Sequence, residues 1–261
     1  HEVTRAHLVP PIVLALAKHP MVEGYAFPKL KTIMSGAAPL GPELAEDCAR
    51  RLGCTVKQGY GLTETSPVTH LNPEPPGRVV PGSIGICIPN TECRIVDYET
   101  GKDLGTGMQG ELWIRGPQVM RGYLNNEEAT NQTIDPEGWL KTGDIAEVDE
   151  DGYFKIVDRV KELIKYKGFQ VAPAELEALL LTHPSIADCA VVPAEDPEAG
   201  EIPVGFVVYK ENMVENPETI MEFIAQKVSP QKKIRRIIQI EQIPKSPSGK
   251  ILRRYLRDQI A

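Results

Sequence analysis

Several features that would mark other protein classes are missing from this 261-residue sequence. No apolar run approaches the roughly 20 residues of a membrane-spanning helix, so no transmembrane segment is expected. The five cysteines form no Cys-x-x-Cys pair and have no histidine beside them, a pattern typical of free thiols in a reducing compartment. The motifs GxxxxGK(S/T), GxSxG and HExxH are absent, which argues against P-loop NTPases, α/β-hydrolases and zincin metalloproteases.

Acidic residues outnumber basic ones, and the formal charge is −7. This balance argues against a nucleic-acid partner. One segment differs, because residues 227–257 contain ten basic residues and the single acid Glu241. Such a segment is either a solvated helix face or a surface for a polyanionic ligand such as a phosphorylated cofactor, and composition leaves both open.

The first 159 residues are expected to form one domain with two parts. Residues 1–80 alternate between helical and strand patterns, which predicts an α/β arrangement with ligand loops at the carboxyl ends of the strands. Residues 81–159 contain short β-type runs separated by Gly, Pro, Asp and Asn turns, which predicts a small β-barrel or sheet subdomain. The predicted helices are 9–18 and 43–52, and the predicted strands are 30–35, 55–59, 92–97, 110–115 and 153–157.

Residues 160–261 are expected to form a separate, mobile α+β domain. A hinge is expected at residues 157–170 (VDRVKELIKYKGFQ), because a charged segment that contains glycine joins two unlike domains there. The predicted helices of this domain are 173–181, 217–227 and 250–259, and its predicted strands are 186–193, 202–209 and 236–240.

Four short motifs could carry chemistry, and each also has a purely structural explanation. SGAAPL (35–40) offers a flat floor for an aromatic ring, or a helix-entry turn. GYGLTET (59–65) offers free backbone N–H groups, a hydroxyl for phosphate and a carboxylate for Mg²⁺, or a tight turn. WLKTGD (139–144) could present its aspartate to the hydroxyls of a ribose, or form an Asx turn. PKSPSGK (244–250) could hold a lysine beside developing negative charge, or leave it solvated.

The order of these motifs resembles that of the adenylate-forming superfamily, which comprises acyl-CoA synthetases, beetle luciferases and peptide-synthetase adenylation domains. The segments YKGFQVAPAELEALLLTHP and IPKSPSGKIL are most similar to those of 4-coumarate–CoA ligases, and the resemblance covers essentially the whole chain. It implies the adenylate-forming enzyme fold and two half-reactions. A small-molecule carboxylic acid first attacks the α-phosphate of Mg-ATP, giving acyl-adenylate and pyrophosphate. The thiol of coenzyme A then displaces AMP.

In the larger domain, the resemblance implies that Tyr60 stacks on the adenine and that Thr63 binds the α-phosphate. Glu64 would bind Mg²⁺, and Asp144 would hold the ribose hydroxyls. The adenine floor and the backbone beside it would comprise Gly36, Ala37, Ala38, Gly59 and Gly61. The acyl pocket would include several of these residues together with Met34, Pro67 and Val68. Since Met34 is apolar, a medium- or long-chain fatty acid stays open as the substrate beside a hydroxycinnamate.

At the end of the larger domain, the resemblance implies that Arg159 contacts ribose or phosphate. In the smaller domain, Lys250 would stabilise the adenylation transition state. Rotation about a hinge near Lys161 would then withdraw Lys250 and bring a second set of residues to the site. That set would comprise Lys165, Lys167, Gly168 and Gln170, and the phosphates of coenzyme A would be the polyanion for the basic segment.

The phosphate loop of the superfamily, a stretch like YTSGTTGLPKG, is absent. The chain is therefore expected to be a C-terminal portion of such an enzyme, and to be inactive alone. Two alternatives remain open: a non-catalytic module that binds adenylate or coenzyme A, and a luciferase-type monooxygenase, which shares every motif. The final residues are not an SKL-type signal, so a cytoplasmic location is expected, with the peroxisome as the alternative. The sequence does not indicate the oligomeric state.

Overall fold

The computed structural model describes residues 2–74 and 78–260. The chain forms two compact units, His1–Ile156 and Val157–Ala261. The division falls within strand β9 (Phe154–Arg159), and the boundary predicted after Arg159 lies at the end of the same strand. Among the described residues, no helix combines the length and apolar character needed to cross a membrane.

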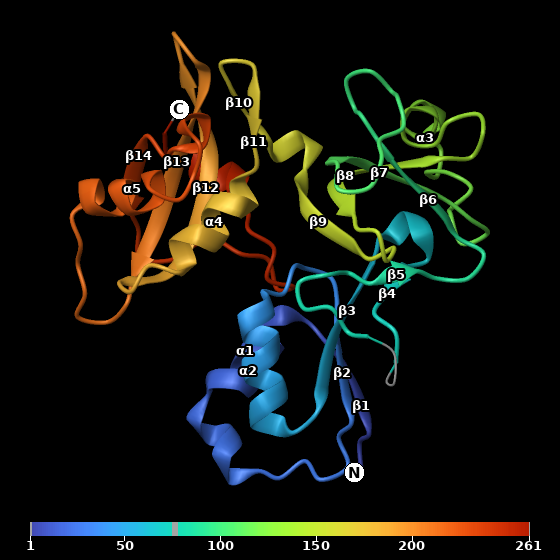
Figure 1. The fold of residues 1–261 in the computed structure, drawn as a ribbon, viewed down its shortest axis with the longest axis horizontal. Coiled ribbons are helices and arrows are strands. Elements are labelled where there is room, and N and C mark those ends of the chain that lie inside the picture. Colours follow the sequence, from blue (N-terminus) through green and yellow to red (C-terminus); the bar gives the residue numbers. More distant parts are fainter. Residues whose placement is uncertain (1, 75–77, 261) are drawn as a thin grey trace. The chain divides into compact units, whose positions relative to one another are not determined.

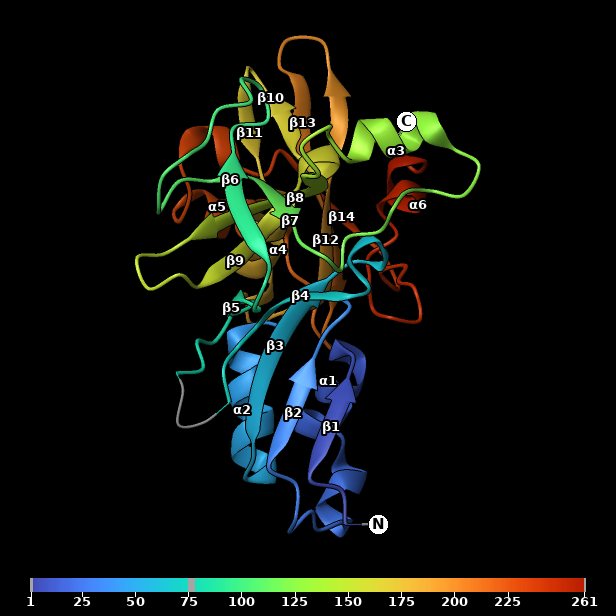
Figure 2. The same cartoon turned by 90° about the vertical axis from the view of Figure 1, so that its right-hand side faces the viewer.

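The first unit begins with a sheet of order β1-β2-β3-β4-β5. The first three strands are parallel, and the last two run antiparallel to their neighbours. Figures 1 and 2 show two helices, α1 and α2, on one face of the parallel strands. The bounds are β1 (Arg5–Leu8), α1 (Pro10–Lys18), β2 (Thr32–Ser35), α2 (Pro42–Leu52), β3 (Thr55–Gly61), β4 (Val68–Leu71) and β5 (Ile86–Cys87).

The helices of this sheet follow local sequence signals. Both carry proline in the first turn, where the missing N–H costs nothing. Helix α2 ends at Gly53, whose φ of 65° is the left-handed conformation that glycine adopts without steric cost. Val13 of α1 and Cys48 of α2 pack with Ile33 of β2 in one apolar core. Burial of this core holds the parallel strands in register, so the segments that follow β2 and β3 emerge at the same edge.

The remainder of the first unit is a second sheet of order β6-β7-β8-β9, with one helix, α3. The prediction of a small β-barrel is wrong. Among the described residues the strands form an open antiparallel sheet, because the edge strands β6 and β9 do not pair with each other, and four strands are fewer than the about five of even small barrels. The bounds are β6 (Glu92–Val96), β7 (Gly110–Arg115), α3 (Glu127–Thr133) and β8 (Leu140–Val148).

The second unit is a five-stranded sheet of order β11-β10-β13-β12, with β14 pairing β13 in parallel. Strand β12 is buried on both faces: Val191 packs against helices α4 and α5, whereas Val192 packs in the core that contains Leu256 of α6. The bounds are β10 (Ile164–Tyr166), β11 (Phe169–Val171), α4 (Pro173–Leu181), β12 (Ile186–Asp196), β13 (Gly200–Tyr209), α5 (Pro217–Ala225), β14 (Arg236–Gln239) and α6 (Arg253–Arg257). Four short 3₁₀ segments complete the described fold, at Pro20–Gly24, Thr63–Thr65, Val160–Glu162 and Pro230–Lys232.

Candidate active site

Two predicted nucleotide-binding residues of the first unit, Tyr60 and Asp144, meet directly. The Tyr60 hydroxyl donates a hydrogen bond to Asp144 Oδ2 at 2.5 Å, although the two residues lie 84 positions apart. Tyr60 comes from the end of β3 and Asp144 from the middle of β8, so the contact joins the two sheets of the unit. Asp144 is only 6% exposed. An aromatic face and a carboxylate thus stand together at the carboxyl edge of the parallel strands.

Small residues lie at this edge. After β2, Ala37 has a φ of 71°, a conformation that costs energy for any residue with a Cβ and that is often found where a chain contacts a ligand. A Cβ placed on Gly36 would lie 3.8 Å from the Gly59 carbonyl oxygen, and one on Gly59 would lie 3.7 Å from Met34 Sδ. Gly36 and Gly59, and the side chain of Met34, are therefore neighbours. Ala38 follows in the same turn, ahead of α2.

Gly61 marks the closest approach of backbone to backbone in this region. It pairs with Val68 across β3 and β4, and a Cβ at Gly61 would lie 1.7 Å from the Pro67 carbonyl oxygen. Only glycine fits there. Pro67 follows a cis peptide bond from Ser66. The predicted pocket residues Met34, Pro67 and Val68 are thus all positioned at the ends of β2, β3 and β4.

Thr63 and Glu64 lie in a 3₁₀ turn between β3 and β4. Thr63 is exposed, whereas Glu64 is partly buried and accepts a hydrogen bond from the Tyr123 hydroxyl at 2.7 Å. That bond to the Glu64 carboxylate raises the pKa of Tyr123. The Glu64 carbonyl also accepts from the Met120 N–H. Tyr123 was not predicted as a site residue, because it lies 59 positions from Glu64.

Asp144 is presented by an irregularity of β8 and not by an isolated turn. Trp113 of β7 pairs with Lys141, and Glu111 pairs with Ile145, so three residues of β8 stand opposite one residue of β7. A bulge of this kind redirects side chains and is common beside active sites. All of the WLKTGD motif except Trp139 therefore belongs to β8, and its aspartate leaves the ladder at the bulge.

Two side chains hold the bulge in place. Glu111 Oε1 accepts the Gly143 N–H at 2.9 Å, and Glu111 Oε2 accepts the Trp113 indole N–H at 2.8 Å. The Thr142 hydroxyl donates to the Leu112 carbonyl at 2.7 Å and accepts the N–H of Asp144 at 3.1 Å. Glu111 is a residue that the sequence did not indicate, because its partner Gly143 lies 32 positions away.

Replacing Glu111 by alanine is expected to destabilise the first unit by about 1–3 kcal/mol, since two donors lose their acceptor. Urea denaturation followed by tryptophan fluorescence reports on this sheet, because both tryptophans of the chain, Trp113 and Trp139, lie in or beside it. Glu150→Ala, an exposed residue of a turn, is the matched control and should change stability by less than about 0.5 kcal/mol. Equal stability of the two variants would show that Glu111 does not hold the bulge.

In the second unit, the predicted hinge segment begins with a buried carboxylate. Asp158 Oδ1 accepts the N–H of Arg159 at 2.7 Å, and its Oδ2 accepts the N–H of Ala174 in the first turn of α4 at 2.8 Å. Burial raises the pKa of Asp158, against the two backbone hydrogen bonds, which lower it. Arg159 and Lys161 follow with exposed side chains. Asp158 thereby ties the end of β9 to α4.

The lysine-rich part of this segment is a tight hairpin between β10 and β11. Its turn residues, Lys167 and Gly168, have φ values of 48° and 81°. Two consecutive positive φ values define the type I′ turn, which matches the twist of hairpin strands. Lys165 pairs with Gln170, so their side chains project from the same face of the hairpin. A Cβ on Gly168 would meet no heavy atom within 4 Å, so crowding does not exclude a side chain there. The positive φ of Gly168 is what favours glycine at this position.

Lys250 lies on an exposed loop that closes upon Ser246. The Ser246 N–H donates to the Lys250 carbonyl at 2.8 Å, and the Lys250 N–H donates to Ser246 Oγ at 3.1 Å. This pairing leaves Lys250 outside the last helix, which begins at Arg253 and not at residue 250 as predicted. The lysine side chain is exposed.

Ion pairs anchor both ends of that loop to the rest of the unit. Before it, the Lys245 ammonium contacts both carboxylate oxygens of Asp188, at 2.8 and 2.7 Å. After it, the Arg253 guanidinium donates to Glu177 Oε1 at 2.6 Å and to the Val191 carbonyl at 3.2 Å. Burial raises the pKa of Glu177, and Arg253 opposes that effect. The loop carrying Lys250 is thereby fixed to β12 and α4.

The predicted residues thus fall into two sets. Those of the first unit gather at the ends of β2, β3 and β4 and at the β8 bulge. Those of the second unit occupy the β9 end, the β10–β11 hairpin and the Lys250 loop. Their roles toward nucleotide, acid and coenzyme A stay predictions.

Comparison with known proteins supplies the family. The AMP-binding enzyme family matches residues 1–124, and the AMP-binding enzyme C-terminal domain matches residues 175–250. The 4-coumarate-CoA ligase 2 of Narcissus pseudonarcissus is 54% identical over 263 residues, which are 99% of this chain and 46% of that protein. The 4-coumarate–CoA ligase 1 of Glycine max is 53% identical over 267 residues, which cover 100% of this chain and 91% of that sequence.

Among solved structures, ATP-bound MatB from Rhodopseudomonas palustris has the same fold, with a TM-score of 0.93 and 28% identity over 98% of this chain and 51% of that one. The chain thus spans about half the length of MatB and of the Narcissus relative. Its fold is that of the adenylate-forming enzymes. The chain belongs to the AMP-binding enzyme family and is a homologue of the 4-coumarate–CoA ligases.

Proposed function

We propose that the chain supplies the adenine- and ribose-binding edge and the mobile C-terminal domain of an ATP-dependent acid–thiol ligase. The enzyme would convert a carboxylic acid into an acyl-adenylate and transfer the acyl group to coenzyme A. The observation that carries the proposal is the hydrogen bond from Tyr60 to Asp144, at the strand edge where open α/β sheets bind nucleotides. Because the chain spans about half of its Narcissus relative, the activity is proposed for the chain acting with an upstream half.

The residues at this edge suit AMP. The Tyr60 ring offers a flat face for adenine, and the nearby Asp144 carboxylate can accept hydrogen bonds from both ribose hydroxyls. The turn after β2 carries no bulky side chain, so backbone at Gly36, Ala37 and Ala38 can lie against a ring. The Tyr60 hydroxyl is already hydrogen-bonded to Asp144 in the structure. The Tyr60 ring and the Asp144 carboxylate can therefore contact one ligand without rearrangement.

Thr63 and Glu64 are the proposed contacts to the phosphates. The exposed Thr63 hydroxyl can donate to an α-phosphate oxygen, and the carboxylate oxygens of Glu64 are the hard ligands that Mg²⁺ prefers. Mg²⁺ would neutralise charge on the phosphates. Tyr123, which donates to Glu64, would keep that carboxylate oriented.

The second unit is proposed to serve the two half-reactions in turn. Lys250, exposed on a loop with anchored ends, would stabilise negative charge on the carboxylate and α-phosphate oxygens during adenylation. After rotation about a hinge near Lys161, the β10–β11 hairpin would present Lys165, Lys167 and Gln170 for the thiol step. Gly168, which carries no side chain, would line the narrow passage for the thiol arm of coenzyme A.

The proposed substrate is an aryl-propenoate or a medium- or long-chain fatty acid. The names of the Narcissus and Glycine relatives favour the first class. The apolar Met34, beside the Gly59 backbone, suits an apolar acyl group and leaves the second class open.

A chimera tests the proposal. The chain is joined to the upstream half of the Narcissus relative and assayed for pyrophosphate release with ATP, Mg²⁺, coenzyme A and a panel from 4-coumarate to long-chain fatty acids. We expect acid-dependent release of pyrophosphate and formation of a thioester, both lost in Asp144→Ala. Tyr60→Phe, which keeps the ring and removes the hydroxyl, is the matched variant and should retain most activity. A folded chimera that binds AMP but activates no acid would instead indicate a non-catalytic binding module.

A further inference from the structure

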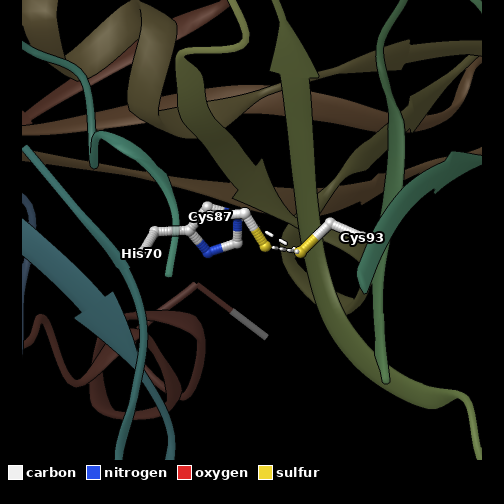
Figure 3. A group of neighbouring side chains, drawn as sticks. All are labelled: His70, Cys87 and Cys93. Atoms are coloured by element: carbon white, nitrogen blue, oxygen red, sulfur yellow. Dashed lines mark hydrogen bonds between the residues drawn. The ribbon is translucent and has the colours of Figure 1, made fainter. Parts of the chain in front are cut away.

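Three side chains outside the proposed ligase site converge in the first unit. Figure 3 shows the His70 ring and the Cys87 and Cys93 thiols directed toward one another. His70 Nε2 lies 3.4 Å from Cys93 Sγ, and the two sulfurs lie 2.9 Å apart. One ligand atom from each residue falls within 4.8 Å of the other two. Both cysteines are free thiols.

The backbone brings this cluster together from three strands. His70 of β4 is the direct antiparallel partner of Cys87 on β5, so their side chains project from the same face of the sheet. Cys93, the second residue of β6, reaches the pair after the short connection from β5. This cluster was not predicted from the sequence, because no histidine neighbours either cysteine along the chain. The antiparallel pairing of β4 with β5 makes the cluster.

The other ring nitrogen of His70 is also occupied. Nδ1 lies 3.0 Å from the Thr69 hydroxyl, which in turn donates to the Tyr60 carbonyl at 3.4 Å. If the Thr69 hydroxyl gives its proton to the Tyr60 carbonyl, the Thr69 oxygen accepts the Nδ1–H of His70. In that tautomer Nε2, which faces the cysteines, is the unprotonated nitrogen. Metal-binding histidines commonly have their second nitrogen held in this way.

We propose that His70 Nε2, Cys87 Sγ and Cys93 Sγ bind one transition-metal ion, with Zn²⁺ as the preferred ion. Two thiolates and an imidazole form a soft to borderline donor set, which selects Zn²⁺ or Cu⁺ over Mg²⁺ or Ca²⁺. His70 is fully buried, whereas both cysteines are partly exposed, so an ion can enter and water can complete four-fold coordination. Each thiol gives up a proton as it binds the ion.

Two of the three ligand-atom distances compare directly with those of a tetrahedral site, and the third, from His70 to Cys87, is within 4.8 Å. Around a tetrahedral Zn²⁺ with ordinary bond lengths, a nitrogen and a sulfur ligand lie about 3.5 Å apart, and two sulfurs lie about 3.8 Å apart. The His70–Cys93 distance of 3.4 Å already fits. The sulfurs, at 2.9 Å, must separate by roughly 0.9 Å. Cys87 is partly exposed, so rotation of its side chain away from the Thr91 carbonyl would let the two sulfurs separate.

A metal ion bound to His70 would stabilise the nucleotide-binding edge through the contact of His70 with Tyr60. His70 is the cross-strand partner of Tyr60, and their ring centroids are 5.9 Å apart. On its other side the His70 ring packs on Phe154 of β9 at 4.6 Å. An ion held by β4, β5 and β6 would therefore tie together the two sheets of the first unit, next to the residue proposed to stack on adenine.

Metal titration of the 261-residue chain tests the proposal. The chain is reduced, freed of metal with a chelator and titrated with Co²⁺ without oxygen. We expect a thiolate-to-cobalt charge-transfer band that saturates at one equivalent and is abolished by one equivalent of Zn²⁺. Zn²⁺ should also raise the melting temperature. In an alkylation experiment read by mass spectrometry, Zn²⁺ should protect Cys87 and Cys93 and leave the modification of Cys54 unchanged.

Variants assign the ligands. Cys93→Ser and His70→Asn each remove a proposed ligand and should weaken Co²⁺ binding by about tenfold or more. Thr69→Val removes the hydroxyl that holds His70 Nδ1, and should also weaken Co²⁺ binding by about tenfold or more. Cys54→Ser is the matched control and should bind as the unaltered chain does. Absence of both the cobalt band and the alkylation protection would overturn the proposal, and these two measurements need no variant to fold. A Cys87–Cys93 disulfide that forms even with Zn²⁺ present would also overturn it.

Discussion

Replacing Lys250 by alanine in the chimera is expected to slow acyl-adenylate formation by about 10²–10³-fold, the usual cost of removing one preorganised charge-stabilising donor. The side chain is exposed on a loop that is anchored on both sides, so its removal should leave the fold intact. Transfer from preformed acyl-adenylate to coenzyme A should change little, because Lys250 is proposed to act only in the first half-reaction. Pyrophosphate exchange and thioester formation measure the two steps separately.

Lys102→Ala is the matched control for Lys250→Ala. It removes one positive charge from an exposed residue outside the predicted sites and outside the basic segment 227–257, without touching the hydrogen bonds of the Lys250 loop. Both half-reactions should keep nearly their full rate in this variant. If Lys250→Ala slowed the two half-reactions equally, Lys250 would not have the role proposed for it.

Replacing Gly61 by alanine is expected to destabilise the first unit by about 3 kcal/mol. The added Cβ would lie 1.7 Å from the Pro67 carbonyl oxygen and 2.5 Å from its carbon, so β3 and β4 must move apart. For a unit of this size the melting temperature should fall by roughly 6–12 °C. The Thr63–Glu64 turn joins these strands, so AMP binding should weaken as well. Differential scanning calorimetry and titration with AMP measure the two effects.

Gly24→Ala distinguishes crowding from the general cost of replacing glycine. Gly24 is exposed at the end of a 3₁₀ segment, its φ lies outside the left-handed region, and a Cβ there would meet no heavy atom within 4 Å. Its melting temperature should stay within about 2 °C of the unaltered chain, since surface changes rarely exceed 0.5 kcal/mol. A similar small shift for Gly61→Ala would show that β3 and β4 are not in close contact there.

Local signals in the sequence were sufficient for much of the fold. Helix α4 was predicted with its observed bounds, Pro173–Leu181, because proline opens it and its apolar residues repeat at helical spacing. Strand β7 was likewise predicted as Gly110–Arg115, since its buried and half-buried residues alternate. In both elements the residues that fix the structure lie within the element itself.

Elements that depend on distant partners were missed. Strand β8 contains polar residues at its bulge, and only the non-local Glu111 and Leu112 make that bulge stable. Strand β4 is four residues long and contains a polar histidine that is buried by Tyr60 and Phe154. The prediction of a helix from residue 250 was wrong because the backbone of Lys250 pairs with Ser246. In the candidate site, Tyr60 and Asp144 were predicted by the resemblance, but their direct contact was not, because it joins positions 84 apart.

The β8 bulge limits how this chain can gain or lose residues. It adds two residues to β8, an even number, so the inward and outward alternation of side chains is the same on both sides of it. Leu140 before the bulge and Ala146 after it accordingly both face buried partners on β7, Ile114 and Gly110. Deletion of a single residue here would reverse the direction of every side chain on one side of the bulge. The apolar side chains there would then face solvent. Length variation in β8 should therefore be tolerated only in steps of two.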